Sequence, residues 1–183
     1  MKESKRGSIG SISPECVPYC LLTPRERQVL QHTADGLSNA ETAREMGISR
    51  KTVDAFKGRI GRIGTPNREV YWHEGNIARP VLLALIQDGI ENGYIHHSHG
   101  ETRIRPLSSR EDKVLDELSQ GLSREEIAKS KRISTKTVNT HMAHVMMKLG
   151  VKNFYHAVAR RTYLKFHGQW EVADNHGRRA LSS

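Results

Sequence analysis

Length, composition and charge limit this chain to a few classes of protein. Its 183 residues are 36% hydrophobic and 5% aromatic, which suits small helical units better than one large core. The formal net charge of +9 suits a polyanionic partner such as nucleic acid, or an anionic membrane surface. No apolar run approaches the roughly 20 residues of a membrane span, and no signal-peptide pattern is visible. We therefore expect a cytoplasmic protein.

Residues 1–20 are rich in Ser, Gly and Lys and predict a disordered N-terminal arm. Cys16 and Cys20 are loosely spaced and no second pair follows, whereas structural zinc sites usually have four ligands. We therefore expect no metal here and reduced thiols at both positions.

Three helix starts follow in the next stretch of the chain. Thr23 and Glu26 have the spacing of a capping box, in which each side chain binds the other residue's backbone N–H, and Ser38 and Glu41 repeat it. Ser49 can cap a third helix. That third segment is strongly basic and contains Arg50, Lys51, Lys57, Arg59 and Arg62.

Residues 68–76 look like an inserted loop before a fourth helix at 77–94. Tyr71 and Trp72 in this loop can stack on a base, but such a pair more often covers a hydrophobic seam, which we favour. The apolar face of the fourth helix is wider than one small domain needs, which predicts a packing partner. It consists of Val81, Leu82, Leu85, Ile86 and Ile90.

A polar, His-rich linker occupies residues 96–106 and is followed by a second helical segment at 107–167. His96, His97 and His99 with Glu101 are metal-ligating residue types, but a solvated linker is the favoured interpretation. After this second segment, residues 168–183 are polar and predict a flexible tail.

The second segment repeats the signals of the first. Ser108 with Glu111, and Ser123 with Glu126, are capping boxes. Ser134 can cap a longer helix with a buried stripe at Val138, Met142, Val145 and Leu149. A short helix, a tight turn and a second helix with a polar outer face make a helix-turn-helix, whose second helix fits the major groove.

The second segment resembles the DNA-binding domain of the LuxR (GerE-like) type, a four-helix helix-turn-helix module of bacterial transcription regulators. The resemblance rests on Leu107, Arg110, Glu111, Val114, Leu115, Gly121, Leu122, Ser123, Glu126, Ile127, Ala128, Ile133, Ser134, Thr137, Val138, His141, Lys148, Leu149, Gly150 and Val151.

The first segment, residues 21–95, resembles a degenerate copy of the same domain. Adding 85 to its residue numbers aligns it with the second copy, which indicates an internal repeat. The shared residues are Leu22, Arg25, Glu26, Val29, Leu30, Gly36, Leu37, Ser38, Glu41, Ala43, Ile48, Ser49, Lys51, Thr52 and Val53. The resemblance implies an all-α fold of two tandem four-helix helix-turn-helix domains joined by the polar linker.

The resemblance also implies which residues face DNA. In the second copy they are Lys136, Thr137, Asn139, Thr140, Ala143 and Lys148, and in the first Arg50, Lys51, Thr52, Asp54, Lys57 and Arg59. Asp54 stands where the family commonly has a lysine; an acid repels phosphate but can accept from a cytosine amine. We expect phosphate contact from the first copy, the alternative being a copy that only packs.

These features predict a sequence-specific transcription regulator that binds double-stranded DNA. The alternative is an antagonist that pairs with another LuxR-type regulator through the fourth helix, which often makes the dimer contact in this family; a homodimer is the third arrangement left open. No nucleophile–base pair, phosphate-binding Gly loop or carboxylate cluster indicates an enzyme. We expect no cofactor, metal or small-molecule ligand.

Overall fold

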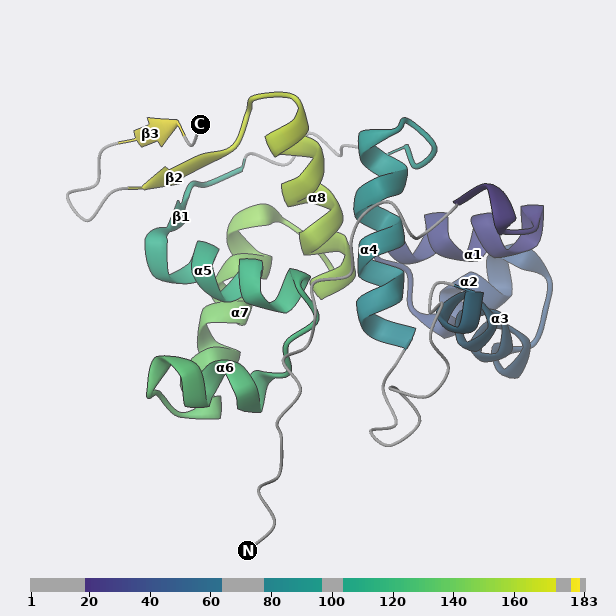
Figure 1. Cartoon of the computed structure of the whole chain (residues 1–183), viewed down its shortest axis with the longest axis horizontal. Helices are drawn as coiled ribbons and strands as arrows, with labels where there is room; N and C mark the ends of the chain where they lie inside the picture. The colour runs from purple at the N-terminus through teal and green to yellow at the C-terminus, as the bar shows by residue number, and fades with distance from the viewer. Residues whose placement is uncertain (1–18, 64–77, 97–103, 174–178, 182–183) are drawn as a thin grey trace, which may run out of the picture.

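The computed structural model describes residues 19–63, 78–96, 104–173 and 179–181. Within this part the protein is essentially all-α, with two tandem four-helix units and one small sheet (Figure 1). Cys16, the loop at 68–76 and the histidines at 97 and 99 lie outside the described residues.

The first unit begins before its first predicted helix. Its helices are α1 (Pro24–Ala34), α2 (Asn39–Met46), α3 (Arg50–Ile63) and α4 (Ala78–Glu91), after a 3-10 turn at Tyr19–Leu21. Both predicted capping boxes are present, at Thr23 and at Ser38. Tyr19, which falls in the predicted arm, is buried and stacks on Tyr94 with ring centroids 4.9 Å apart.

The second unit has the same order of elements. Its helices are α5 (Ser109–Ser119), α6 (Arg124–Lys131), α7 (Thr135–Leu149) and α8 (Phe154–Phe166). The capping boxes predicted at Ser108 and Ser123 are confirmed, and Ser134 caps α7. All four residues of the predicted stripe on α7 are buried. These starts form where predicted because a cap satisfies orphan N–H groups within a few residues of itself.

The described part of the C-terminal segment differs from the expected flexible tail. Three short strands, β1 (Leu107–Ser108), β2 (Glu171–Ala173) and β3 (Arg179–Leu181), form a sheet in which β2 is parallel to β1 and antiparallel to β3. Trp170 is only 3% exposed, and the Arg161 guanidinium lies 5.7 Å from its ring centroid. Arg161 also pairs with Asp112 at 3.0 Å. The polar composition of this segment gave no sign of the sheet, because the buried aromatic ring of Trp170 is a single residue among polar neighbours.

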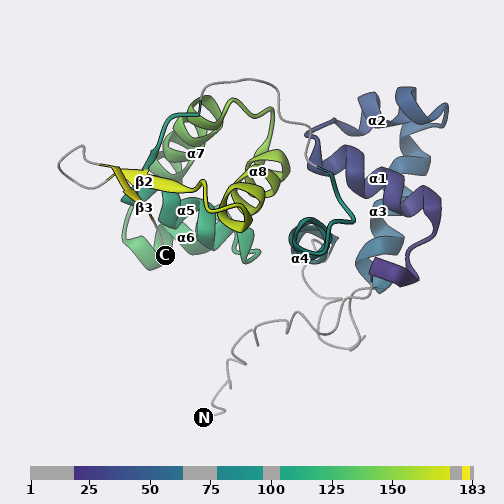
Figure 2. The same cartoon turned by 90° about the horizontal axis from the view of Figure 1, so that it is seen from above.

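The two units meet through their fourth helices. α4 and α8 lie side by side between the remaining helices of the two copies (Figures 1 and 2). α4 contributes Leu82 and Leu85 to the hydrophobic core of the first copy, but Leu83 to that of the second. α8 in turn contributes Ala159 to the core of the first copy. The predicted apolar face of α4 therefore lies in the core of its own copy, where Ala159 of α8 joins it, whereas Leu83, outside that face, packs into the second copy.

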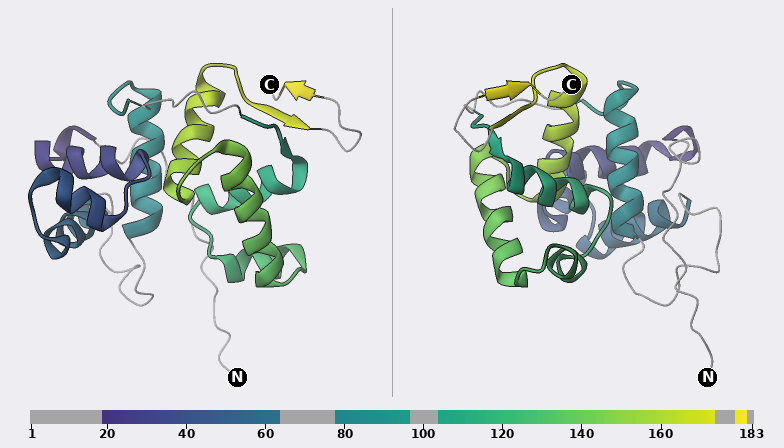
Figure 3. Two further views of the ribbon diagram at one scale, coloured as in Figure 1. Left: turned by 180° about the vertical axis from the view of Figure 1, so that it is seen from behind. Right: turned by 60° about the vertical axis from the view of Figure 1, so that its left-hand side comes forward.

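The contacts at the two ends of this interface are equivalent, which gives it quasi-two-fold symmetry. Figure 3 shows the two units on opposite sides of α4 and α8. Asn153, which caps α8, donates from Nδ2 to the carbonyl of Gly36 at 2.9 Å. Arg79, at the start of α4, donates from Nη2 to the carbonyl of Gly121 at 3.1 Å. Gly36 and Gly121 are equivalent in the repeat and have φ of +78° and +92°. Each fourth helix therefore begins against the first inter-helix turn of the opposite copy.

Candidate nucleic-acid interface

The polar face of α7 presents an accessible row of predicted DNA-facing residues. Ser134 accepts the backbone N–H of Thr137 at 3.0 Å and sets the start of the helix. Thr137 is half-buried, and its hydroxyl lies 2.9 Å from that of Ser134. Four predicted residues are exposed on this helix: Lys136, Asn139, Thr140 and Ala143. The structure thus brings a cation, an amide, a hydroxyl and a methyl group together opposite the buried stripe.

α3 occupies the equivalent place in the first copy. Ser49 accepts the backbone N–H of Thr52 at 3.0 Å, as Ser134 does for Thr137. Arg50, Lys51 and Asp54 are exposed, whereas Thr52 is half-buried. The predicted residues of the first turns therefore form an accessible surface of mixed charge.

Asp54 and Lys57 are engaged by a third residue that the sequence did not single out. Asn39, the first residue of α2, donates from Nδ2 to Oδ1 of Asp54 and accepts at Oδ1 from Nζ of Lys57 at 2.6 Å. Burial lowers the pKa of Lys57, while the negative charge of Asp54 acts in the opposite direction. The ammonium of Lys57 is therefore directed to a protein partner in this structure.

Two other predicted cations pair with buried glutamates beneath the outer helices. Arg59 Nε lies 3.0 Å from Oε1 of Glu26, although the Arg59 side chain remains 59% exposed. Lys148 Nζ lies 2.7 Å from Oε2 of Glu111 and is 28% exposed. Burial alone would raise the pKa of Glu111, but hydrogen bonds from Lys148 and Ser108 outweigh it and hold that pKa below its usual value. Arg59 thus keeps more accessible surface than Lys148.

Comparison with known proteins agrees with this geometry. The family model of the bacterial regulatory proteins of the luxR family matches residues 21–73 and 105–160, together more than half of the chain. The chain belongs to this family. Its two matched segments contain the first three helices of each copy and, in the second, the start of α8. DNA-binding transcription regulation is the general role to which the luxR family points.

The curated relatives are considerably longer than the matched region. The chain is 30% identical over 86 residues to the oxygen regulatory protein NreC of Staphylococcus aureus strains MRSA252 and JH9. The match covers 47% of this chain and 40% of NreC. No solved structure matches the chain.

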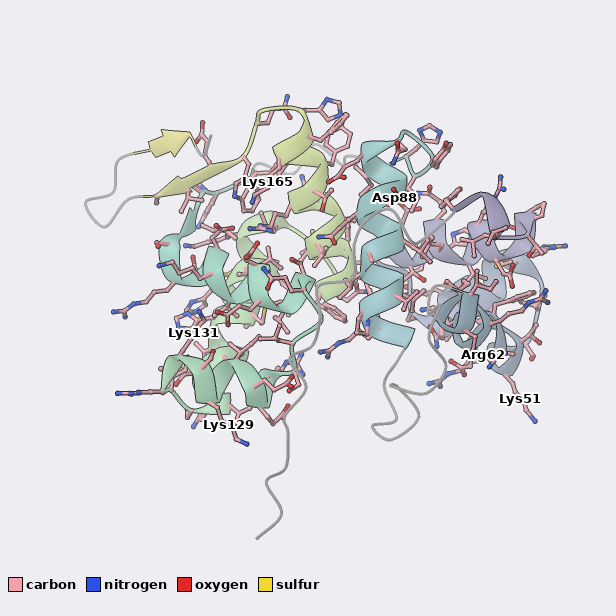
Figure 4. The ribbon with its side chains drawn as sticks, viewed as in Figure 1. Lys51, Arg62, Asp88, Lys129, Lys131 and Lys165 are labelled. Carbon is pink, nitrogen blue, oxygen red and sulfur yellow. The ribbon has the colours of Figure 1, made fainter. Side chains whose placement is uncertain are left out.

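The structure adds basic residues to the expected luxR-family surface. Figure 4 shows Lys51 of α3 and Lys129 of α6 at the same edge of the molecule, on opposite sides of the α4–α8 pair. Arg132, in the turn between α6 and α7, is exposed and has a φ of +53°. The equivalent residue in the first copy is Gly47, with a φ of +64°. Comparing the copies could have suggested this site, because a left-handed turn residue is usually glycine.

The described residues also bear on two other possibilities, a metal site and a membrane span. Among the residues that the structure describes, no group of three His, Cys, Asp or Glu side chains is placed to hold a metal ion. His96 is exposed, and its backbone N–H binds the Gln31 side chain at 3.1 Å. None of the described helices is long and apolar enough to cross a membrane.

Proposed function

We propose that this chain is a sequence-specific transcription regulator that binds one double-stranded DNA site with both of its helix-turn-helix units. The two outer helices, α3 and α7, enter successive major-groove segments, and surrounding cations contact phosphates. Sequence preference comes from the exposed side chains of these helices, while phosphate contacts supply most of the salt-dependent affinity.

The observation that carries this proposal is the quasi-two-fold packing of α4 against α8. Two-fold dimers of helix-turn-helix proteins bind half-sites about 34 Å apart, one turn of DNA. Here the fourth helices of a single chain pair with each other, and Gly36 and Gly121 receive equivalent contacts from opposite copies. Covalent linkage also makes the second unit's binding intramolecular. One chain therefore has the symmetry that other regulators obtain from two.

The composition of the outer faces supports an asymmetric target. Asp54 of α3 corresponds to Asn139 of α7, and Gly58 corresponds to Ala143. A carboxylate only accepts hydrogen bonds, whereas an amide both donates and accepts. The two half-sites should accordingly differ in sequence although the order of helices is repeated.

The antagonist alternative is favoured by Asp54, whose negative charge repels phosphate. The burial of the apolar residues of α4 argues against this alternative, because the pairing was expected through the fourth helices. Leu82, Leu85 and Ile86 are each no more than 2% exposed and pack within this chain. Pairing with another regulator, or with a second copy, through these residues would require the core of the first unit to open.

The deciding experiment is to select bound duplexes from random DNA and weigh the complex on the shortest selected site. We expect one chain per duplex and two unequal half-sites whose centres are roughly one helical turn apart. Two chains per duplex, or a perfectly palindromic site, would contradict the single-chain arrangement.

A salt titration of the same complex tests DNA binding itself. The logarithm of the binding constant should fall linearly with the logarithm of salt concentration, by about 0.9 per neutralised phosphate. Absence of binding at low salt would exclude the regulator and leave the antagonist.

A further inference from the structure

Three polar side chains of the first copy form a continuous chain that ends on the outer face of α3. Asn39 Nδ2 donates to Asp54 Oδ1, and Asn39 Oδ1 accepts from Lys57 Nζ at 2.6 Å. Asp54 is exposed, while Asn39 and Lys57 are half-buried. The network therefore joins α2 to α3 and leaves the Asp54 carboxylate accessible.

The charges at its two ends fix the orientation of the Asn39 amide. An amide has one acceptor oxygen and one nitrogen with two donors. Its oxygen meets the ammonium of Lys57 and its nitrogen meets the carboxylate of Asp54. Turning the amide over would set oxygen against carboxylate and nitrogen against ammonium, which are both repulsive. Oδ1 of Asp54 is consequently held, while Oδ2 keeps its capacity to accept a hydrogen bond.

The inner end of the network is held by the second copy. Lys57 Nζ lies 5.8 Å from the ring centroid of Tyr155 on α8, within the range of a cation–π interaction. Tyr155 packs against the cores of both copies. The position of Lys57 is thus determined by Asn39 within the first copy and by an aromatic ring from the other.

The second copy has no equivalent network. The counterparts of Asn39, Asp54 and Lys57 are Arg124, Asn139 and Met142. Met142 is 2% exposed and belongs to the core of the second copy, where it cannot donate to an amide. A charged residue at the matching core-facing position of α3 is therefore a feature of the first copy alone.

We propose that Asn39, held by Lys57, is a positioning residue that orients the Asp54 carboxylate to accept from the exocyclic amine of a cytosine in the half-site of the first copy. This inference rests on the proposed DNA-binding function and names the base that Asp54 reads. Of the major-groove edges, cytosine offers the N4 amine, whereas adenine offers its N6 amine next to the N7 acceptor. A carboxylate is repelled by that second acceptor, so cytosine is the matching base.

The test uses the full chain and selection from random duplex DNA. The unmodified protein should prefer cytosine at one position of one half-site. Asp54→Asn should change that preference to adenine, because an amide can pair with N6 and N7 together. Asn39→Ala should lower the cytosine preference by about tenfold, the scale of one base contact, without altering the other half-site. Lys57→Met, which copies the residue of the second unit, should lower it in the same way.

Arg124→Ala is the matched control, because Arg124 is the counterpart of Asn39 in the second copy. It should leave the cytosine position unchanged. If Asn39→Ala and Lys57→Met bind DNA with the original cytosine preference, the positioning role is wrong while the proposed function stands. If Asp54→Asn keeps cytosine, Asp54 does not read this base. If the unmodified chain selects no DNA, both the inference and the proposed function fail. Because Asp54 is exposed, its variant remains informative even if a variant at Asn39 folds poorly.

Discussion

The two copies in this chain share a buried glutamate under the outer helix, α3 or α7, but differ in the residues exposed on that helix. Each has a buried glutamate at the same position, Glu26 or Glu111, which ties the first helix of its copy to the outer helix. The partner of Glu26 is Arg59, whereas Glu111 pairs with Lys148 and lies 3.6 Å from His144. The scaffold thus tolerates a change of partner as long as the buried charge is compensated.

This difference shows which positions the fold constrains. Leaving a buried carboxylate without a partner is strongly destabilising, whereas substitutions on an exposed face usually change stability by less than about 0.5 kcal/mol. Asp54 and Asn139 occupy equivalent exposed positions, so their side chains can differ without disturbing either core. Sequence reading can therefore diverge between two copies that keep one architecture.

The largest effect is expected from valine at Gly36 or Gly121, which tests whether the two ends of the interface are equivalent. A Cβ would lie 2.6 Å from His156 Nδ1 at Gly36, and 2.9 Å from Pro80 Cβ at Gly121. Positive φ adds backbone strain at both positions. Strain and overpacking together should lower the free energy of unfolding by roughly 2–4 kcal/mol, measured by urea titration.

The control for these variants is Gly47→Val, which meets no atom within 4 Å and is affected by the positive φ alone. It should lose clearly less stability than either interface variant. Tolerance of valine at only one of the two interface glycines would contradict the quasi-two-fold description.

The second prediction is that stability depends on pH through one end of the interface and not through the other. Burial, with the positive charges of Arg160 and Lys152, lowers the pKa of His156 from 6.5 to about 4. The unfolded chain therefore takes up a proton as the pH falls through 6.5 while the folded chain does not, so stability is lost between these values. We expect the thermal midpoint to fall between pH 7 and pH 5, and to fall less in His156→Gln.

The matching contact at Gly121 is made by Pro80, which does not titrate. Substituting Pro80 by alanine should leave the slope of stability against pH unchanged, whatever it does to stability itself. An equal slope in the unmodified protein and in His156→Gln would show that His156 is not responsible.

A smaller effect is expected where the turns between the helices of each helix-turn-helix differ. Arg132 adopts a φ of +53°, and its counterpart Gly47 a φ of +64°. A left-handed conformation costs a residue with a side chain about 1–2 kcal/mol relative to glycine. Arg132→Gly should therefore raise the free energy of unfolding by about 1 kcal/mol, and Gly47→Arg should lower it by a similar amount. Chemical denaturation of the pair provides the measurement; a loss of stability in Arg132→Gly would refute the strain.

The smallest effect concerns DNA affinity and asks whether both copies contact phosphate. Lys51 and Lys136 are equivalent in the repeat, and both are exposed. Alanine at either position should weaken binding severalfold on all sequences and reduce the salt slope by roughly one counterion. A normal slope in Lys51→Ala beside a reduced slope in Lys136→Ala would mean that the first copy only packs.

The sequence by itself determined the local structure of this protein. The capping boxes at Thr23, Ser38, Ser108 and Ser123 were predictable because a cap and its partner lie three residues apart. The stripe on α7 and the repeat offset of 85 residues were equally visible, since both depend only on residue type and spacing. These signals were sufficient to identify two helix-turn-helix units and their exposed faces.

Only the tertiary structure decided what those faces and turns contact. A periodic apolar pattern shows that α4 has a face to bury, but it does not show that the same helix also packs against α8 of the other copy and contributes Leu83 to its core. The bond from Asn153 to Gly36 joins residues 117 positions apart, and no local pattern encodes such a pair. Asn39 likewise gave no sequence signal, because its role depends on α2 and α3 bringing Asp54 and Lys57 to its two ends. Hydrogen bonds between distant segments depend on how whole helices pack, which residue spacing alone does not specify.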